Sequence, residues 1–189
     1  DSNFFNMAFF SPNDRYRLNN ERLALGKSLF FDPVLSGNNT ISCSSCHLPA
    51  KAFTDGREKA RGLGGHVLSR NTPTLWNSVF QTKQFYDSRA VTLENQFSEV
   101  VHNEKEMKGS LKDLVESLHL DARYSELFKN AYPNERNPIT QFTIANAVAH
   151  YVRSLVAFNS RFDRFMRGEE LALNETEKAG FNLFAGKAK

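Results

Sequence analysis

The amino-acid sequence predicts an all-α fold in which long irregular loops separate the helices. Across residues 138–158, apolar side chains recur three and four positions apart, the spacing that places them on one helix face. Residues that favour helix starts open three further segments, and stretches rich in Gly, Asn and Pro lie between them. No apolar run approaches the about 20 residues that a membrane-spanning helix needs.

The first elements lead toward the only two cysteines of the chain. Residues 21–31 are expected to form a short helix, because leucine and phenylalanine supply its apolar contacts. Residues 32–41 then form a turn region, marked by Pro33 and Gly37. After the cysteines, residues 51–71 are polar and rich in glycine, and an unstructured loop of this length is usually functional or mobile.

Two later helices are predicted from their first residues. Thr72 suits the N-cap position and Pro73 the first helical position, so a helix is expected to start there. Ser110, followed three residues later by Asp113, indicates a second start, and this helix should run through Leu118.

The clearest helix is expected over residues 138–158, as a scaffold helix with no chemistry of its own. Its predicted apolar face consists of Phe142, Ala145, Val148, Val152 and Leu155. A last helix is expected over residues 174–186, and its second half is similar in character to residues 26–31, which precede the cysteines. A second motif of the same kind could therefore follow, and we expect the chain to be the first part of a longer protein.

Composition supports a packed core and excludes some classes of partner. Of the 189 residues, 40% are hydrophobic, and the 17 Phe are consistent with large flat apolar surfaces as well as with ordinary core filling. The Phe pairs at 4–5 and 9–10 are expected to pack on the domain as an arm. The net charge of +3 is spread along the chain without a basic block, so nucleic acid is not expected as a partner.

Cys43, Cys46 and His47 form the C-x-x-C-H pattern that covalently anchors a c-type haem. The two sulfurs reach the two vinyl groups of one porphyrin, and the adjacent imidazole then falls over the iron as proximal ligand. A redox disulfide would need a thioredoxin-like βαβ context, and structural zinc would need further ligands where no further cysteine exists. Haem attachment is therefore the favoured interpretation, and it places the mature protein in the periplasm or on the external face of a bacterial membrane.

Segments on both sides of this motif follow the pattern of a known family. They are residues 26–33, 35–37, 41–43, 49–56, 70–77 and 85–90, together with His47. In these segments the chain resembles the N-terminal, peroxidatic haem domain of bacterial di-haem cytochrome c peroxidases and of the related methylamine-utilisation-type di-haem enzymes. The similarity covers nearly the whole chain and is far more specific than the cysteine motif alone.

The resemblance implies a mostly helical protein of two cytochrome c-like domains with one haem each. Residues 1–189 would form the N-terminal haem domain, and residues 174–189 would start the connection to the C-terminal one. Hydrogen peroxide would be reduced to water at the haem of this chain, with electrons supplied through the second haem by a small cytochrome c or copper protein. The resemblance also implies a calcium ion, with Asn71 as a ligand, and leaves a homodimer open.

The resemblance assigns catalytic roles to two residues. Gln96 falls on the family's distal glutamine, and Glu106 on its catalytic glutamate, which would exchange protons with the peroxide oxygens. Judged from composition alone, Glu106 belongs to a charged run that equally fits a solvated helix end.

Three positions depart from the family pattern. Leu63 occupies the position of a loop histidine that caps the resting iron in many members, so we favour an open site, with His66 in a shifted loop as the alternative ligand. His102 and Met107 carry ligating atoms as well, but they are ranked below the open site. Tyr86 replaces a tryptophan between the two haems, and Val100 replaces a proline of the distal wall.

Three functions remain open at this point. The leading one is a peroxidase domain. The second is a di-haem oxidase that acts on a protein or an organic substrate, which the tyrosine at position 86 keeps open. The third is an electron-transfer cytochrome with six-coordinate iron and no turnover.

Overall fold

The computed structural model describes residues 19–187, so the two Phe pairs near the start lie outside it. These residues form helices, short 3₁₀ turns and loops, and no strand is found among them, as the sequence predicts. The chain divides into two compact units at Val156, and each is described by itself. Among the described helices, none is both long and apolar enough to cross a membrane.

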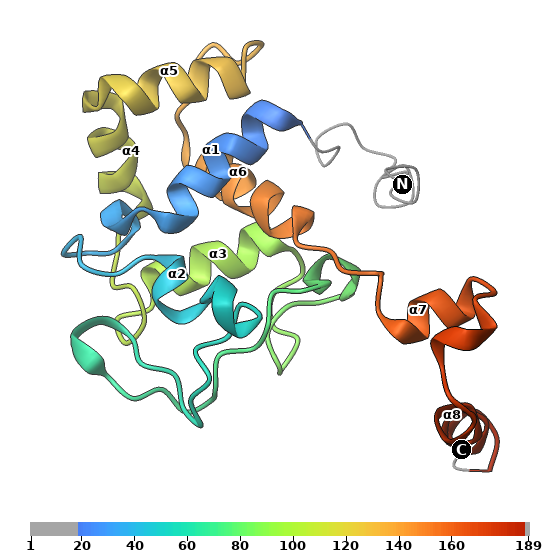
Figure 1. Cartoon of the computed structure of the whole chain (residues 1–189). Helices are drawn as coiled ribbons and strands as arrows, with labels where there is room; N and C mark the ends of the chain where they lie inside the picture. The colour runs from blue at the N-terminus through green and yellow to red at the C-terminus, as the bar shows by residue number, and fades with distance from the viewer. Residues whose placement is uncertain (1–18, 188–189) are drawn as a thin grey trace. The chain divides into compact units, whose positions relative to one another are not determined.

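Over residues 19–156, the first unit has six α-helices and four 3₁₀ turns. The helices are labelled in Figure 1. The helices are α1 (Asn20–Phe31), α2 (Cys43–Cys46), α3 (Leu93–His102), α4 (Leu111–Leu120), α5 (Ala122–Ala131) and α6 (Gln141–Ser154). The turns are η4 (Pro33–Leu35), η5 (Pro49–Lys51), η6 (Leu63–Gly65) and η7 (Ser78–Phe80). The long stretch between α2 and α3 has no α-helix, and it holds His47, His66, Asn71 and Tyr86.

The core of this unit is the contact of α1 with α6. Gly26 allows the two helices to approach closely, because a Cβ at this position would lie only 1.9 Å from the carbonyl oxygen of Ala147. Leu25, Leu29 and Phe30 of α1 are buried there, and the ring of Phe30 lies 4.9 Å from that of Tyr151. The tight crossing makes α6 the scaffold against which α1 and α3 pack.

A buried polar network fixes α3 on α6. Both carboxylate oxygens of Glu94 accept hydrogen bonds of 2.8 Å from the guanidinium of Arg153. Asn146 donates to the same carboxylate at 3.1 Å, and its own amide oxygen accepts from the hydroxyl of Tyr132 at 3.0 Å. Because a buried charge is tolerated only when it is paired and hydrogen-bonded, this network determines where α3 lies.

The predicted helices over residues 21–31, 110–118 and 174–186 are confirmed by α1, α4 and α8. The helix expected over residues 138–158 is shorter, because Thr140 and Thr143 form a capping box that starts α6 at Gln141. Phe142 is 41% exposed, so its assignment to the apolar face is wrong, whereas the other four predicted positions are buried.

The helix predicted to start at Thr72 and Pro73 is wrong. The hydroxyl of Thr72 makes no capping bond, and the chain runs on without an α-helix until α3. Thr74 instead donates to the carbonyl of Ala52 at 2.6 Å and accepts from the backbone N–H of Trp76 at 3.1 Å. These contacts to another loop outweigh the local helix signal of the Thr-Pro pair.

The second unit contains α7 (Arg161–Met166), the 3₁₀ turn η8 (Glu170–Ala172) and α8 (Glu175–Ala185). Asn174 caps α8 as expected, with its side-chain oxygen accepting from the N–H of Glu177 at 2.9 Å. The unit is held by a two-point ion pair between Arg161 and Glu177 and by the ring of Phe181 against Phe162 at 5.1 Å.

Candidate functional site

The cysteine motif forms one short helical turn. Ser42 precedes α2, and its N–H donates to the hydroxyl of Ser45 at 3.0 Å, which fixes the start of the turn. The N–H of His47 donates to the carbonyl of Cys43 at 2.9 Å, so the histidine ends the same turn. Cys43 and Cys46 are half-buried thiols with no disulfide between them in this part of the chain. Two sulfurs and one imidazole are thus presented together, as the motif predicts.

The imidazole of His47 lies against two backbone carbonyls, those of Phe53 and Pro73. Its Nδ1 lies 2.9 Å from the carbonyl oxygen of Phe53. A carbonyl can only accept, so Nδ1 carries the proton and Nε2 keeps its lone pair. Burial lowers the pKa of His47, and the carbonyls of Phe53 and Pro73 oppose this effect. The ring is therefore held as a neutral imidazole with Nε2 available to a metal, the form that ligates haem iron.

Two left-handed residues aim the Phe53 carbonyl. Ala52 has a φ of 52° and Phe53 a φ of 57°, a conformation that costs a non-glycine residue about 1 kcal/mol or more. Three hydrogen bonds hold this turn. Thr74 binds the carbonyl of Ala52, the N–H of Phe53 donates to Leu48 at 2.8 Å, and the N–H of Leu48 donates to Thr54 at 3.1 Å. Two consecutive left-handed residues thus lie in the segment that orients the predicted iron ligand.

The residues present fit a covalently attached haem. Burial raises the pKa of Cys43 to about 12, so with no group bound this thiol is protonated. Within residues 19–187, no group of three or more His, Cys, Asp or Glu side chains is placed to hold a metal ion. The described residues also leave three buried oxygens without a hydrogen-bond partner, all between α2 and α3: Oδ2 of Asp55, Oγ1 of Thr72 and Oγ of Ser78. Structural zinc, the alternative weighed for the motif, thus lacks its further ligands.

A hydrogen-bonded loop at residues 60–68 connects the cysteine turn with Glu106. The Sγ of Cys46 donates to the carbonyl of Arg61 at 3.4 Å, and two residues later the N–H of Leu63 donates to the carbonyl of Glu106 at 2.7 Å. Gly62 lies between them, where a Cβ would come within 1.9 Å of the carbonyl of Lys105. Only glycine allows the loop to lie this close to the Glu106 segment. The residue 60–68 loop therefore contacts both Cys46 and the backbone of Glu106.

The same loop places the two alternative positions for an iron ligand differently. Leu63 is buried, with 8% exposure, whereas His66 is exposed. The structure also places the other two side chains with ligating atoms, one in the core and one at the surface. Met107 lies in the hydrophobic core, and Nδ1 of His102 lies 2.7 Å from the carbonyl of Ser98 in its own helix.

Glu106 is half-buried and held by one side-chain contact. The amide nitrogen of Asn103 donates to its Oε1 at 3.1 Å. Burial raises the pKa of Glu106, Glu99 adds to the increase, and Arg89 opposes it. The charge of Glu106 in turn contributes to raising the pKa of Cys46, so the carboxylate lies within electrostatic reach of the cysteine turn. The structure therefore brings the predicted acid–base residue to the haem-attachment residues.

The predicted distal residues on α3 share one face of that helix. Gln96 and Val100 are half-buried and lie one turn apart, and Asn103, the C-cap of α3, continues the same face. This face ends at the turn that carries Glu106. Gln96 and Val100 thus lie on the α3 face that leads, through the C-cap residue Asn103, to the turn with Glu106.

Tyr86 lies on a short hairpin and points to solvent. The hairpin is closed by the N–H of Gln84, which donates to the carbonyl of Ala90 at 2.8 Å, and Tyr86 is 92% exposed. The guanidinium of Arg70 lies 5.3 Å from its ring centre and 3.1 Å from Asp87. A cation over an aromatic face holds such a ring at the surface.

Asn71, the predicted calcium ligand, is exposed next to the buried Thr72. The calcium assignment stays a prediction. The next residue, Thr72, has a buried hydroxyl without a hydrogen-bond partner among the described residues.

Sequence reasoning missed three groups that shape the site. The Phe53 carbonyl orients His47, Asn103 contacts Glu106, and Arg89 opposes the raised pKa of Glu106. A backbone carbonyl has no residue-type signal. The Asn103 contact follows a recognisable local pattern, an asparagine whose side chain closes a turn over the next residues.

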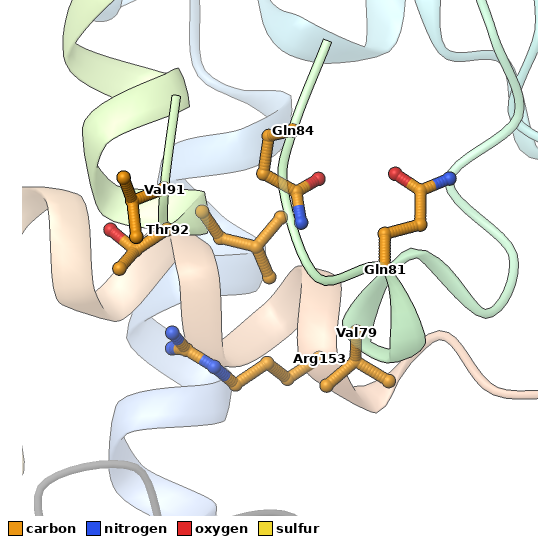
Figure 2. A pocket seen from close by; sticks show the side chains of 7 residues that line it. Val79, Gln81, Gln84, Val91, Thr92 and Arg153 are labelled. Carbon is orange, nitrogen blue, oxygen red and sulfur yellow. The ribbon is translucent and has the colours of Figure 1, made fainter. Parts of the chain in front are cut away.

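The structure also contains a cavity of about 190 Å³. Figure 2 shows the side chains that line it. It is lined by Val79, Gln81, Gln84, Val91, Thr92, Leu93 and Arg153, and none of the predicted site residues is among them. The cavity therefore does not identify the candidate site. The cysteine turn and the Glu106 segment are assigned to it by the contacts described above.

Known proteins are similar to this chain in sequence. Residues 20–171 match the sequence pattern of the family described as di-haem cytochrome c peroxidase. The methylamine utilization protein MauG of Methylorubrum extorquens is 40% identical over 168 residues, which are 89% of this chain and 47% of that protein. Cytochrome c peroxidase Ccp of Escherichia coli K12 is 37% identical over 165 residues, or 87% of this chain and 35% of that protein.

Solved structures agree with the fold. A crystal structure described as a MauG-like protein associated with microbial copper homeostasis matches with a TM-score of 0.83 and 34% identity. The match covers 94% of this chain and 53% of that one. The diheme peroxidase BthA from Burkholderia thailandensis matches with a TM-score of 0.73 and 27% identity, over 93% of this chain and 50% of that one. The chain thus spans about half the length of these relatives, or less.

Proposed function

Because the chain belongs to the di-haem cytochrome c peroxidase family, we propose that its first unit reduces hydrogen peroxide to water at one covalently bound haem. One peroxide molecule takes up two electrons and two protons and yields two molecules of water. The chain spans 47% of its MauG relative and 35% of its peroxidase relative, so a second haem domain completes the proposed enzyme. The electrons would come from a small redox protein through that second domain.

The haem is proposed to be held by three residues of one turn. Cys43 and Cys46 would form the thioether bonds, and Nε2 of His47 would bind the iron, since its Nδ1 is committed to Phe53. When bound, the haem supplies the redox chemistry, because it accepts electrons singly and passes them to peroxide.

Glu106 is proposed to move the proton between the two peroxide oxygens. Its carboxylate takes the proton from one oxygen and returns it to the other, which leaves as water. Burial raises the pKa of Glu106, so its protonated and ionised forms lie closer in energy at neutral pH than for an exposed glutamate. Gln96, on the α3 face that leads to Glu106, would position the oxygens by donating from its amide.

The site is proposed to be open without a preceding activation step. Leucine has no lone pair for iron, and Leu63 occupies the position of the capping histidine. The contact of Leu63 with the Glu106 backbone and the close approach of Gly62 hold this loop in place, and His66 is exposed at its tip. These features favour a fixed loop over one that moves to release a ligand.

The observation that carries the proposal is the half-buried Glu106 within electrostatic reach of Cys46. In the complete holoprotein, we expect Glu106→Gln to lower kcat/KM for peroxide by about 10²-fold or more, because a general acid–base contributes this much. Glu104→Gln is the matched control, an exposed glutamate of the same charged run, and it should leave the rate within about two-fold.

Two outcomes would redirect the assignment. Peroxide turnover that stays within a few-fold of normal in Glu106→Gln would remove Glu106 from the mechanism. A visible spectrum with low-spin, six-coordinate iron in both oxidation states would instead support an electron-transfer cytochrome.

A second candidate function is the oxidation of a protein or an organic substrate by the same haem. The observation that favours it is Tyr86, an oxidisable ring that is 92% exposed and covered on one side by Arg70. One curated relative is itself a methylamine utilization protein rather than a peroxidase by name. Loss of substrate oxidation in Tyr86→Phe, with peroxide reduction retained, would support this function.

Two further features belong to the proposal. Covalent haem attachment takes place outside the cytoplasm, so we place the protein in the periplasm or on the external face of the bacterial membrane. Calcium is proposed at Asn71, and the next residue in the chain, Thr72, has a buried hydroxyl without a hydrogen-bond partner among the described residues.

A further inference from the structure

Asn103 makes two different side-chain hydrogen bonds at the end of α3. Its Oδ1 accepts from the N–H of Lys105 at 2.9 Å, and its Nδ2 donates to Oε1 of Glu106 at 3.1 Å. Its backbone takes part as well: the N–H donates to Glu99 at 3.0 Å, and the carbonyl accepts from Glu106 and Lys108 at 3.0 and 2.9 Å. One asparagine therefore both shapes the turn and contacts the carboxylate.

We propose that Asn103 is the positioning residue of Glu106 and determines which carboxylate oxygen carries the proton. An amide N–H needs a lone pair, so Oε1 is committed as its acceptor. The proton that Glu106 exchanges then resides on Oε2. This inference rests on the proposed acid–base role of Glu106, because only in that role does the choice of oxygen matter.

The surroundings of Glu106 leave this orientation to Asn103. The charged and titratable groups that act on the carboxylate are Arg89, Glu99 and the thiol of Cys46. Arg89 is already bound to Glu99 at 2.7 Å and to Asp87 at 2.9 Å. These groups act on Glu106 through space, whereas Asn103 supplies the hydrogen bond that the structure gives to its side chain.

A purely structural role for Asn103 predicts a different response to substitution. Asparagine and aspartate both close this kind of turn through Oδ1, so Asn103→Asp preserves the bond from Lys105. The same substitution replaces the donating Nδ2 by an oxygen and places a second carboxylate against Oε1. If Asn103 only shapes the turn, Asn103→Asp keeps the fold, and Asn103→Ser, which adds no charge, leaves the Glu106 titration unchanged. If Asn103 positions Glu106, Asn103→Asp replaces the hydrogen bond to Oε1 by repulsion between two carboxylates.

The test measures the titration of Glu106 in the complete holoprotein by infrared difference spectroscopy, with Glu106→Gln identifying the carboxyl band. We expect Asn103→Asp to raise the pKa of Glu106 by about one unit or more, because like charges at this distance disfavour ionisation. Because the ionised carboxylate of Glu106 takes the first proton, its titration gives the acidic limb of the pH profile of kcat/KM. The midpoint of this limb should move by the same amount. The melting temperature should stay within about 3 °C of the unsubstituted protein, since the turn is kept.

Asn19→Asp is the matched control. Asn19 caps α1 through Oδ1, which accepts from the N–H of Arg22 at 2.8 Å, so the same substitution again preserves a local bond. It adds the same charge without touching Glu106, and the Glu106 titration should not change. If Asn103→Asp does not yield folded holoprotein, Asn103→Ser replaces it, because serine keeps a turn oxygen but lacks Nδ2. A loss of the charge-assisted bond should then raise the pKa by about one unit.

An unchanged Glu106 titration in the folded variant would overturn the positioning role, whatever the activity. Normal turnover in Glu106→Gln would overturn the proposed function instead. The infrared titration does not depend on turnover, so the two failures can be told apart.

Discussion

At the scale of single residues, the site depends on groups that set the state of another side chain. The carbonyl of Phe53 sets the tautomer of His47, and the amide of Asn103 contacts one oxygen of Glu106. Neither residue carries the chemistry. Both restrict a titratable group to one arrangement, which a motif search for ligands and acids does not detect.

The burial of Glu106 also makes a pH-dependent contribution to stability. Burial raises the pKa of Glu106 above its ordinary value of 4.5, so the folded state binds this proton more tightly than the unfolded state. The stabilisation by this proton is fully present below pH 4.5 and is lost as the pH rises through the folded pKa. We expect Glu106→Gln to remove this loss, so the variant should gain stability relative to the unsubstituted protein between pH 4.5 and 7.5.

Urea unfolding of the holoprotein at these two pH values measures the effect. Glu104→Gln, at an exposed position of the same run, should show the same difference from the unsubstituted protein at both values. An equal difference at both pH values for Glu106→Gln would show that its carboxyl titrates normally.

At the scale of elements, the two glycine-containing helices α1 and α8 are expected to respond oppositely to one substitution. Gly26→Ala would place a Cβ 1.9 Å from the Ala147 carbonyl and should force α1 and α6 apart, at a cost of about 2 kcal/mol or more. Gly180→Ala meets no atom within 4 Å and should stabilise α8 by about 0.5–1 kcal/mol.

Thermal unfolding of both variants tests this contrast. For a chain of this size, the cost in Gly26→Ala corresponds to a melting temperature lower by about 4–8 °C. A Gly26→Ala protein with an unchanged melting temperature would mean that α1 and α6 can separate freely.

The elements that could be predicted from sequence are those whose signals are local. The extent of α4 follows from the Ser110 cap, and α8 follows from Asn174. The Thr72–Pro73 start is equally local, yet Thr74 binds another loop and no helix forms. The helix α3 was not predicted, although Thr92 caps it, because its position depends on the buried Glu94–Arg153 pair, whose partners lie 59 residues apart.

The same distinction separates the predictable from the unpredictable part of the site. Cys43, Cys46 and His47 are adjacent in sequence, and their grouping in one turn could be foreseen. The approach of the residue 60–68 loop to Glu106 joins positions more than forty residues apart, and only Gly62 hints at it. The departures from the family pattern are readable from sequence, but their contacts are not.

At the scale of the whole molecule, the two units differ in how far they bury the same type of helix. Leu29 and Phe30 of α1 are buried, whereas Leu183 and Phe184 of α8 are 56% and 77% exposed. The similar character of the two segments fits our proposal that α8 begins the connection to a second haem domain. To bury Leu183 and Phe184 as α1 buries Leu29 and Phe30, α8 would need a partner helix like α6.

Haem attachment should change the first unit and leave the second unchanged. We expect the intact mass to increase by one haem for the motif in this chain, and removal of both thiols in Cys43→Ser/Cys46→Ser to abolish the increase. In the haem-free protein, hydrogen exchange should rise over residues 51–71, because Cys46 and His47 are contacts of these loops.

Exchange in α8 provides the internal control, since α8 belongs to the separate second unit. A uniform rise over both units would contradict a local role of the haem. If hydrogen exchange over residues 51–71 is unchanged in the haem-free protein, the hydrogen bonds within this segment are sufficient to keep it folded.

The left-handed turn at Ala52 and Phe53 has a consequence for the redox potential of the whole domain. The electron density that an imidazole gives to iron increases with the strength of the hydrogen bond at its Nδ1. Here that bond ends on a carbonyl whose direction is set by two backbone torsions, six residues beyond the ligand. A change in these torsions would therefore change the reduction potential of the iron while every ligand stays the same. The potential would then depend on the backbone conformation at Ala52 and Phe53 as well as on the identity of the ligands.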